Sequence, residues 1–254
     1  MLIGLNVVGF IVFMGWIIVL CSGFGDCVLG VLGSIVVRGV LRFSHRLLPR
    51  FVRFFRYRGL VLFVPEGVFN PVYTVSTGLI IDALSNVFRP RGVFLEIGCG
   101  SGAVSIFVAK YLWDGVEEIY SCDVSDKALA TTMINAEING VIERVKIGNC
   151  YKLLPRLKNK VDFAVANPPY LPIDPRDELD YNWCGGSSLN IFKETINELT
   201  TTLKTGGQGL ITVSSLTSIN KATKILREKK LTTKIIKNTK TPLDTIYLIH
   251  IIKK

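Results

Sequence analysis

The stretch that decides the fold reads Val93-Phe94-Leu95-Glu96-Ile97-Gly98-Cys99-Gly100-Ser101-Gly102. Its first half is an apolar run typical of a buried strand. Its second half is a glycine-rich turn, and residues 103–113 then place apolar side chains at helical spacing. A strand, a glycine turn and a helix in this order are the context that a nucleotide-binding α/β domain requires.

The alternation of strands and helices continues to the end of the chain. We expect further strands at 119–122, 145–147, 161–166, 209–214, 232–236 and 245–251, and helices at 125–139, 188–203 and 218–229. This order predicts an α/β fold, a doubly wound, seven-stranded and mainly parallel sheet of the Rossmann-like type. Ligands of such sheets bind at the carboxyl ends of the strands, where the glycine turn, Asp123 and Asn167 should gather.

A second motif, Asn167-Pro168-Pro169-Tyr170, directly follows the apolar run 161–166. The Asn167 side-chain oxygen and the Pro168 carbonyl can each accept one N–H of a planar amide or amino group, and Tyr170 can stack on it. Such acceptors return electron density to a nitrogen whose lone pair is delocalised, and they orient it. The motif predicts methyl transfer to a planar nitrogen. The predicted catalytic residues are Asn167, Pro168 and Tyr170, and the predicted substrate-binding residues are Asn167, Pro168, Pro169, Tyr170 and Trp183.

An acid beside the glycine turn indicates which cofactor would bind there. Glu96 suits the cationic sulfonium amino acid of S-adenosyl-L-methionine better than a pyrophosphate, and Asp123 can accept both ribose hydroxyls. Asn149 follows the third strand, where an adenine-contacting residue would fall. The predicted cofactor-binding residues are Glu96, Gly98, Gly100, Gly102, Asp123, Asn149 and Asn167.

The cysteines indicate neither a metal site nor a disulfide framework. Six cysteines include no C-x-x-C pair, and the two histidines do not lie near the last four of them in the sequence. We therefore expect reduced thiols and no metal ligand.

Residues 1–60 differ sharply in composition from the rest. Met1 to Gly25 carries no charged side chain. Seven arginines follow between Arg38 and Arg58, and together with the acid Asp26 they give this portion +6 of the net charge of +10. We expect a segment 1–60, apolar and then arginine-rich, and a methyltransferase domain 61–254 that is only mildly basic.

The amino-terminal segment has the features of a membrane anchor. Met1 to Leu20 is long enough to cross a hydrocarbon core, and the arginines after it would keep the catalytic domain in the cytosol. Arg38, Arg42, Arg46 and Arg50 recur every four residues, as in a basic amphipathic helix on anionic lipid. The expected localisation is cytoplasmic. Membrane attachment through residues 1–58 is one alternative, and a start codon assigned too far upstream is the other.

Three segments carry a family resemblance: Leu95 to Ser105, Asn167 to Pro172 and Trp183 to Gly186. In order and spacing they resemble the class I methyltransferases that modify the glutamine of the Gly-Gly-Gln motif in translation termination factors, above all the archaeal and eukaryotic branch. The likeness covers roughly residues 68–254. It implies S-adenosyl-L-methionine at Glu96, Gly98, Gly100 and Asp123, the glutamine amide at Asn167 and Pro168, a release factor as protein substrate, and a small zinc-binding activator subunit as a partner.

Two alternatives stay open. The basic region between Lys221 and Lys240 can hold phosphate, which favours an N6-adenine or other amino-group methyltransferase acting on RNA or DNA. The other alternative is a non-catalytic, membrane-associated binding protein that keeps the fold, although intact Glu96, Asp123 and Asn167 argue against it.

Overall fold

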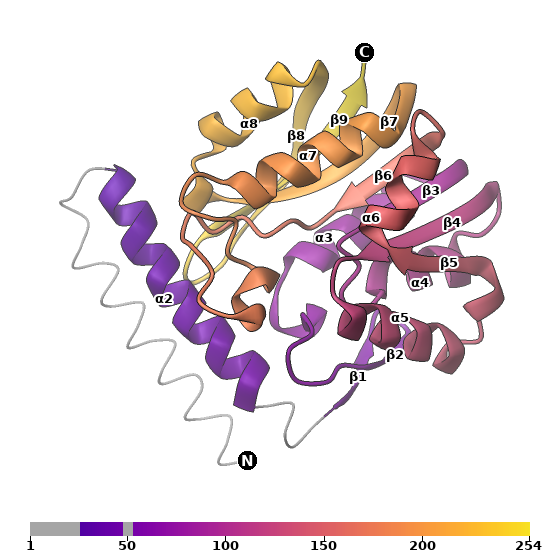
Figure 1. Cartoon of the computed structure of the whole chain (residues 1–254), viewed down its shortest axis with the longest axis horizontal. Helices are drawn as coiled ribbons and strands as arrows, with labels where there is room; N and C mark the ends of the chain where they lie inside the picture. The colour runs from indigo at the N-terminus through magenta and orange to yellow at the C-terminus, as the bar shows by residue number, and fades with distance from the viewer. Residues whose placement is uncertain (1–25, 48–52) are drawn as a thin grey trace.

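The computed structural model describes residues 26–47 and 53–254. At its centre is a seven-stranded sheet of order β5-β4-β3-β6-β7-β9-β8 (Figure 1). The strands are β3 (Gly92–Ile97), β4 (Val116–Asp123), β5 (Val145–Asn149), β6 (Val161–Ala166), β7 (Leu203–Ser214), β8 (Leu231–Lys240) and β9 (Thr245–Lys253). Strands β5, β4, β3, β6 and β7 pair in parallel, and β9 is antiparallel to both of its neighbours. The prediction of a doubly wound, mainly parallel sheet is confirmed.

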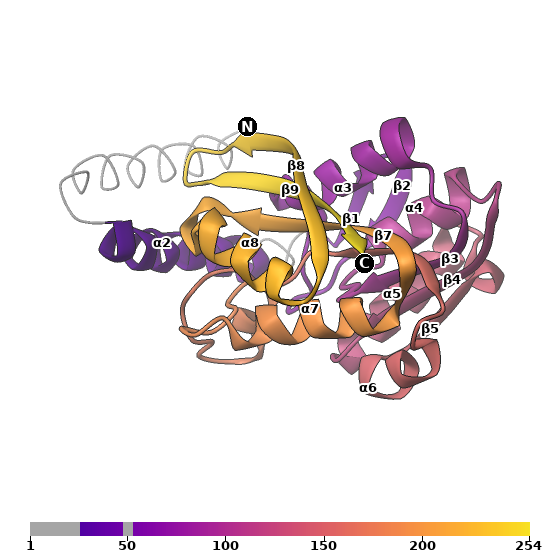
Figure 2. The ribbon, with the colours of Figure 1, turned by 90° about the horizontal axis from the view of Figure 1, so that it is seen from above.

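Helices cover both faces of the sheet (Figure 2). Helices α3 (Ser76–Ala83), α4 (Ala103–Tyr111) and α5 (Asp126–Ile138) lie on one face, and α6 (Cys150–Leu153), α7 (Asn190–Thr202) and α8 (Ile219–Glu228) lie on the other. Successive side chains of a strand point to opposite faces. Phe94 therefore joins the apolar cluster under α3 and α4, whereas Leu95 joins the cluster under α7 and α8.

Two strands are longer than their apolar patterns suggest. Strand β7 begins at Leu203, because Leu203 already pairs with Val161 of β6. The register then shifts, and regular pairing resumes where Gln208 pairs with Phe163. Strand β8 continues to Lys240. It lies at the edge of the sheet, so its backbone can pair with β9 while its lysines remain exposed.

A small hairpin precedes the sheet, and the sequence pattern did not predict it. Strands β1 (Phe54–Tyr57) and β2 (Leu60–Phe63) pair antiparallel, so the hairpin spans residue 60, where the composition changes. Two asparagines hold it, one in α5 and one directly after that helix: Asn135 accepts from Phe63 N at 2.6 Å, and Asn139 accepts from Val61 N at 3.2 Å.

Helix α2 (Asp26–Leu47) lies beside the loops that follow β6 (Figure 1). The guanidinium of Arg42 donates to Asp177 at 2.8 Å and to Asp180 at 2.6 Å, and Arg38 is buried next to Asp180. These two arginines therefore face acids of the protein rather than a lipid surface. Met1 to Leu20 and Arg50 lie outside the described residues. Within 26–47 and 53–254, none of the helices combines the length and the hydropathy that crossing a bilayer requires.

Candidate active site

The carboxyl ends of β3 and β6 lie side by side. Ile97 pairs with Ala166, so the glycine turn and Asn167 start from the same edge of the sheet. From β3 the chain proceeds to β4 and β5 on one side and returns to β6 on the other, which makes this edge the topological switch point. A cavity of about 1060 Å³ opens there, and its lining includes the predicted residues Glu96, Gly98, Gly100, Asp123, Asn167, Pro168 and Pro169. That volume suits a nucleoside-sized ligand together with a substrate side chain.

The glycine turn is held against β4 and leaves space above it. Gly98 N and Cys99 N both donate to the Cys122 carbonyl, at 2.8 and 3.0 Å. Gly98 has a φ of 73°, and a Cβ built on it would meet nothing within 4 Å. Gly102, with a φ of 76°, is tightly packed, since a Cβ there would lie 2.6 Å from Thr132. Gly98 thus keeps the cavity open, while Gly102 seats α4 on α5.

Asp123 lies at the end of β4 and faces the cavity. One carboxylate oxygen accepts from Gly100 N at 2.9 Å, and the other accepts from Ser125 N at 3.0 Å. Each oxygen retains a lone pair for a ribose hydroxyl. Ser125 is the residue that caps α5, with its hydroxyl accepting from Ala128 N at 3.3 Å. Asp123 is therefore not needed as the cap.

Glu96, near the end of β3, is a buried carboxylate that contacts the first turn of α4. Its oxygen accepts from Ser105 N at 2.9 Å, in the first turn of the helix. Burial raises the pKa of Glu96 to about 7, against the lowering effect of the Ser105 hydrogen bonds. A cation arriving in the cavity would find this group half ionised near neutral pH and would favour its charged form.

This raised pKa makes cofactor affinity depend on pH. A cationic ligand needs Glu96 ionised, so protonation below the pKa of about 7 should weaken binding. We expect the dissociation constant of S-adenosyl-L-methionine to rise about tenfold between about pH 8 and about pH 6. Calorimetric titration checks this. Glu96→Gln should flatten the dependence, and Glu118→Gln, a surface acid paired with Lys146, should preserve it. A dependence that persists unchanged in Glu96→Gln would exclude this role.

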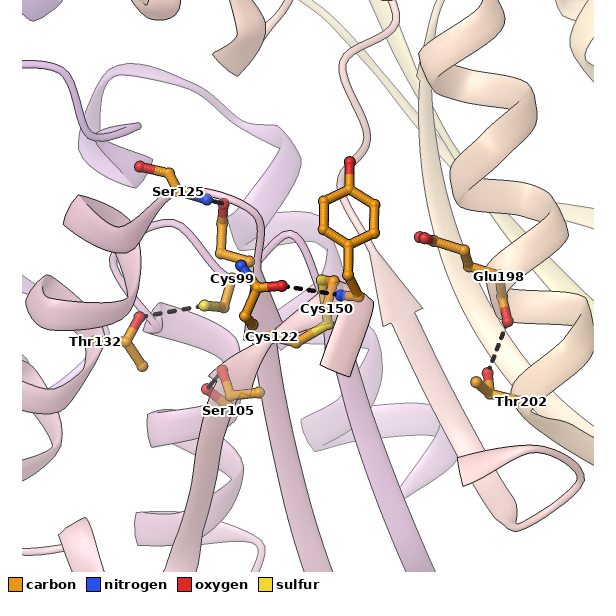
Figure 3. The surroundings of a disulfide bond; sticks show 12 residues. Cys99, Ser105, Cys122, Ser125, Thr132, Cys150, Glu198 and Thr202 are labelled. Carbon is orange, nitrogen blue, oxygen red and sulfur yellow. Dashed lines mark hydrogen bonds between the residues drawn. A yellow bond between two sulfur atoms is a disulfide. The ribbon is translucent and has the colours of Figure 1, made fainter. Parts of the chain in front are cut away.

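A disulfide joins the ends of β4 and β5. Cys122 and Cys150 are bonded, with their Cα atoms 5.0 Å apart (Figure 3). Cys122 precedes Asp123, and Cys150 follows Asn149, whose side chain accepts from Tyr151 N at 3.1 Å and caps α6. The expectation of reduced thiols is wrong for this pair, because strand pairing brings together cysteines that lie 28 residues apart in the sequence. Cys99 and Cys184 remain thiols and are buried.

Reduction of this disulfide should lower stability measurably. A cross-link across 28 residues restricts the unfolded chain, which is worth about 3 to 4 kcal/mol. We expect a reductant to lower the free energy of unfolding of the wild-type protein by about this amount in urea titrations. The variant Cys122→Ser with Cys150→Ser should start at the lower value and ignore the reductant. Equal stability of the oxidised and reduced wild type would contradict the assignment.

The acceptor loop, residues 167–172, is held by hydrogen bonds from β7 and from the short 3-10 turn Ser215–Thr217 that follows it. Thr212 donates to the Asn167 side-chain oxygen at 2.5 Å, and the Thr217 hydroxyl donates to the Tyr170 carbonyl. Tyr170 packs between two apolar clusters instead of lining the cavity, and this burial raises the pKa of its hydroxyl. The stacking role expected of Tyr170 stays a prediction.

The turn Trp183 to Gly186 packs directly on the acceptor loop. Leu171 N donates to the Trp183 carbonyl and Gly185 N donates to the Leu171 carbonyl, both at 2.8 Å. A Cβ on Gly185 would lie 2.5 Å from the Pro169 carbonyl oxygen, so a glycine is needed for this approach. Trp183 itself is 2% exposed, and its ring lies 5.1 Å from the ring of His45. It therefore packs under the acceptor loop and does not line the cavity.

Several cavity residues were not among the predicted site residues. Phe69, Pro71 and Thr77 reach the cavity from the segment before β3, and Glu194 and Glu198 reach it from α7. Of the residues predicted to bind ligands, Gly102, Asn149, Tyr170 and Trp183 lie outside the lining. Asn149 nevertheless caps α6, whose residue Tyr151 lines the cavity, and Gly102 precedes α4, whose residue Ala103 lines it.

Comparison with known proteins shows similarity to methyltransferases. The family model for ribosomal protein L11 methyltransferase (PrmA) matches residues 75–168. Methyltransferase HEMK2 of Mus musculus is 37% identical over 134 residues, which are 48% of this chain and 62% of that protein. The release factor glutamine methyltransferase of Dictyoglomus turgidum is 32% identical over 120 residues, 46% of this chain and 41% of that protein. The chain thus spans less than two thirds of each relative's length.

A solved structure shares the fold. It is the E. cuniculi Mtq2-Trm112 complex, described as responsible for methylation of the eRF1 translation termination factor. The match has a TM-score of 0.55 and 20% identity, and it covers 74% of this chain and 99% of the other. The sheet order, the position of the cavity and these matches agree. The chain has the class I methyltransferase fold and is related in sequence to the release factor glutamine methyltransferases.

Proposed function

We propose that this chain transfers the methyl group of S-adenosyl-L-methionine to a planar nitrogen, and that the nitrogen is the glutamine side chain of a translation release factor. One observation carries the proposal. The glycine turn, Glu96 and Asp123 line the same cavity as Asn167 and Pro168. Groups suited to a cationic nucleoside thus share one space with acceptors suited to an amide.

Each residue then has a chemical task. Asp123 accepts the ribose hydroxyls, and Glu96 attracts the cationic amino-acid portion. The Asn167 oxygen and the Pro168 carbonyl accept the two amide hydrogens, which favours localisation of the nitrogen lone pair and directs it at the methyl carbon. When bound, S-adenosyl-L-methionine would supply the electrophilic methyl group: the N–CH3 bond would form as the S–CH3 bond breaks, S-adenosylhomocysteine would leave, and the methylated nitrogen would release one proton to solvent. The prolines hold the acceptors in place because their φ angles are fixed.

The charge of the cavity favours a protein substrate over nucleic acid. The chain has a net charge of +10, yet its cavity is lined by Glu66, Glu96, Asp123, Asp126, Asp177, Glu178, Glu194 and Glu198 against the bases Arg46 and Lys127. The pKa of Glu198 is raised, mainly because the carboxyl is partly buried and secondly because the charge of Glu194 lies nearby. Phosphates would be repelled there, whereas a neutral glutamine flanked by neutral or basic residues would not.

A small partner subunit is part of the proposal. The E. cuniculi relative was solved as a complex of Mtq2 with Trm112, and we propose that this chain too works with a small activator. Added partner should then raise the turnover or the solubility of the isolated chain.

The decisive experiment offers the protein two substrates. Purified protein with labelled cofactor is incubated with a termination factor that carries Gly-Gly-Gln, and separately with total RNA. We expect label on the factor, located on the glutamine by mass spectrometry, and none on Gly-Gly-Ala. Label on RNA, weakened steeply by added salt, would support the amino-group alternative. Failure to bind the cofactor at all would revive the non-catalytic alternative.

A further inference from the structure

The proposed function leaves open what orients the Asn167 side chain. Its oxygen accepts a hydrogen bond from the Thr212 hydroxyl at 2.5 Å. Thr212 lies on β7, one residue beyond the pair Ala166 and Ile211, so it stands beside Asn167 on the neighbouring parallel strand. On its other side it pairs with Leu248 of β9. The hydroxyl is thus carried by a strand paired on both sides.

The burial of Thr212 makes this hydrogen bond costly to lose. Thr212 is 0% exposed, and Leu210, which shares its side of the strand, belongs to the apolar cluster under α3 and α4. A hydroxyl in such surroundings needs a partner, and it finds one in Asn167. The backbone of the same loop is also held by Thr217, whose hydroxyl donates to the Tyr170 carbonyl.

The orientation of the Asn167 amide also matters chemically, because the oxygen and the NH₂ group of a carboxamide have nearly the same shape but opposite hydrogen-bonding roles. Its oxygen has two lone pairs, while its nitrogen carries two donors. In the structure the Thr212 hydroxyl donates, which holds the Asn167 oxygen on that side and occupies one of its lone pairs. The second lone pair remains for a substrate N–H. Without the hydroxyl, the amide could rotate and present its own N–H groups to the substrate nitrogen, where donor would face donor.

We propose that Thr212 is a positioning residue for methyl transfer, fixing the Asn167 amide so that its oxygen faces the reacting nitrogen. This inference rests on the proposed function. Thr212 does not touch the substrate or the cofactor, and it acts through Asn167.

The kinetic test compares Thr212→Val, which keeps the shape and loses the hydroxyl, with Thr212→Ser, which keeps the hydroxyl. On a termination factor carrying Gly-Gly-Gln, we expect Thr212→Val to lower kcat about tenfold, with cofactor affinity unchanged within about twofold. Thr212→Ser should restore most of the loss. Thr212→Ala should repeat the effect of Val, which covers the case in which Val disturbs packing. Wild-type kcat in both Val and Ala variants would overturn the proposal.

The matched control is Thr202→Val. Thr202 is 1% exposed, and its hydroxyl bonds to the backbone of Glu198 and Leu199 in α7 (Figure 3). It is as buried as Thr212 but is not bonded to the acceptor loop, so kcat should be unchanged. An equal loss in Thr202→Val would mean that removing any buried hydroxyl lowers activity, and would overturn the proposal.

A second readout is independent of the substrate. The side-chain NH₂ signals of Asn167, identified by their loss in Asn167→Ala, should shift in the nitrogen-15 NMR spectrum of Thr212→Val and not in that of Thr202→Val. Thr212→Ser should keep them near the wild-type position. Unmoved signals in Thr212→Val overturn the proposal even if the termination factor is not methylated. A wild-type protein that methylates nothing, with signals that do shift, counts against the proposed function alone.

Discussion

Replacing Asn167 by alanine should lower turnover by about 100-fold or more, the scale typical of one positioned polar group at a reacting centre. Cofactor affinity should stay within a few-fold of the wild-type value. The reason is geometric: Thr212 holds the Asn167 oxygen, and Asn167 lines the cavity, so the loss of this side chain removes the proposed acceptor for one substrate N–H. Single-turnover methylation and calorimetry measure the two quantities separately.

The control for this variant is another asparagine. Asn86 is exposed and donates to the backbone of Asp82, four residues earlier. Asn86→Ala should leave both quantities unchanged. Equal losses of cofactor binding and turnover in Asn167→Ala would show that the residue supports the cavity in general, and the role of substrate acceptor would have to be abandoned.

Replacing Asp123 by alanine should have the opposite profile, raising the dissociation constant of S-adenosyl-L-methionine by about 100-fold or more, through two lost charge-assisted hydrogen bonds. At saturating cofactor, much of the turnover should return. Part of the loss comes from the glycine turn, because Asp123 also accepts from Gly100 N. Calorimetric titration gives the affinity, and kinetics over a range of cofactor concentrations give the recovery.

Asp126 supplies the matched control. It also lines the cavity, but it is exposed in the first turn of α5. Asp126→Ala removes the same charge from the same cavity, so a general electrostatic effect would appear in both variants. Comparable affinity losses at the two positions would rule out Asp123 as the specific ribose ligand.

Much of the fold could be predicted because its signals are local. The run before Gly98 is apolar on both faces of the strand, and in the structure Phe94 and Leu95 indeed enter different clusters. The helix expected at 125–139 is α5, and Ser125 caps it, as serine commonly does at a helix start. The hairpin near residue 60 was missed because its strands are only four residues long, and neither the FFRY of β1 nor the LVLF of β2 alternates clearly between apolar and polar residues.

The site was predicted less completely because many of its contacts join distant parts of the chain. A threonine in an apolar strand has no recognisable signature, and Thr212 meets Asn167 across 45 residues. The disulfide depends on the pairing of β4 with β5. The acids of α7 face the cavity because of how that helix packs, and their spacing alone reads as a solvated helix face.

Helix α2 has a consequence for the order in which the molecule can assemble. Arg42 and its partners Asp177 and Asp180 are separated by 135 and 138 residues, and Asp180 is 0% exposed. A chain made from its amino terminus releases the arginine long before either aspartate exists. Closing so long a loop is slow. Helix α2 can therefore dock on the segment 177–182 only after that segment has been synthesised, whereas the glycine turn can form before then.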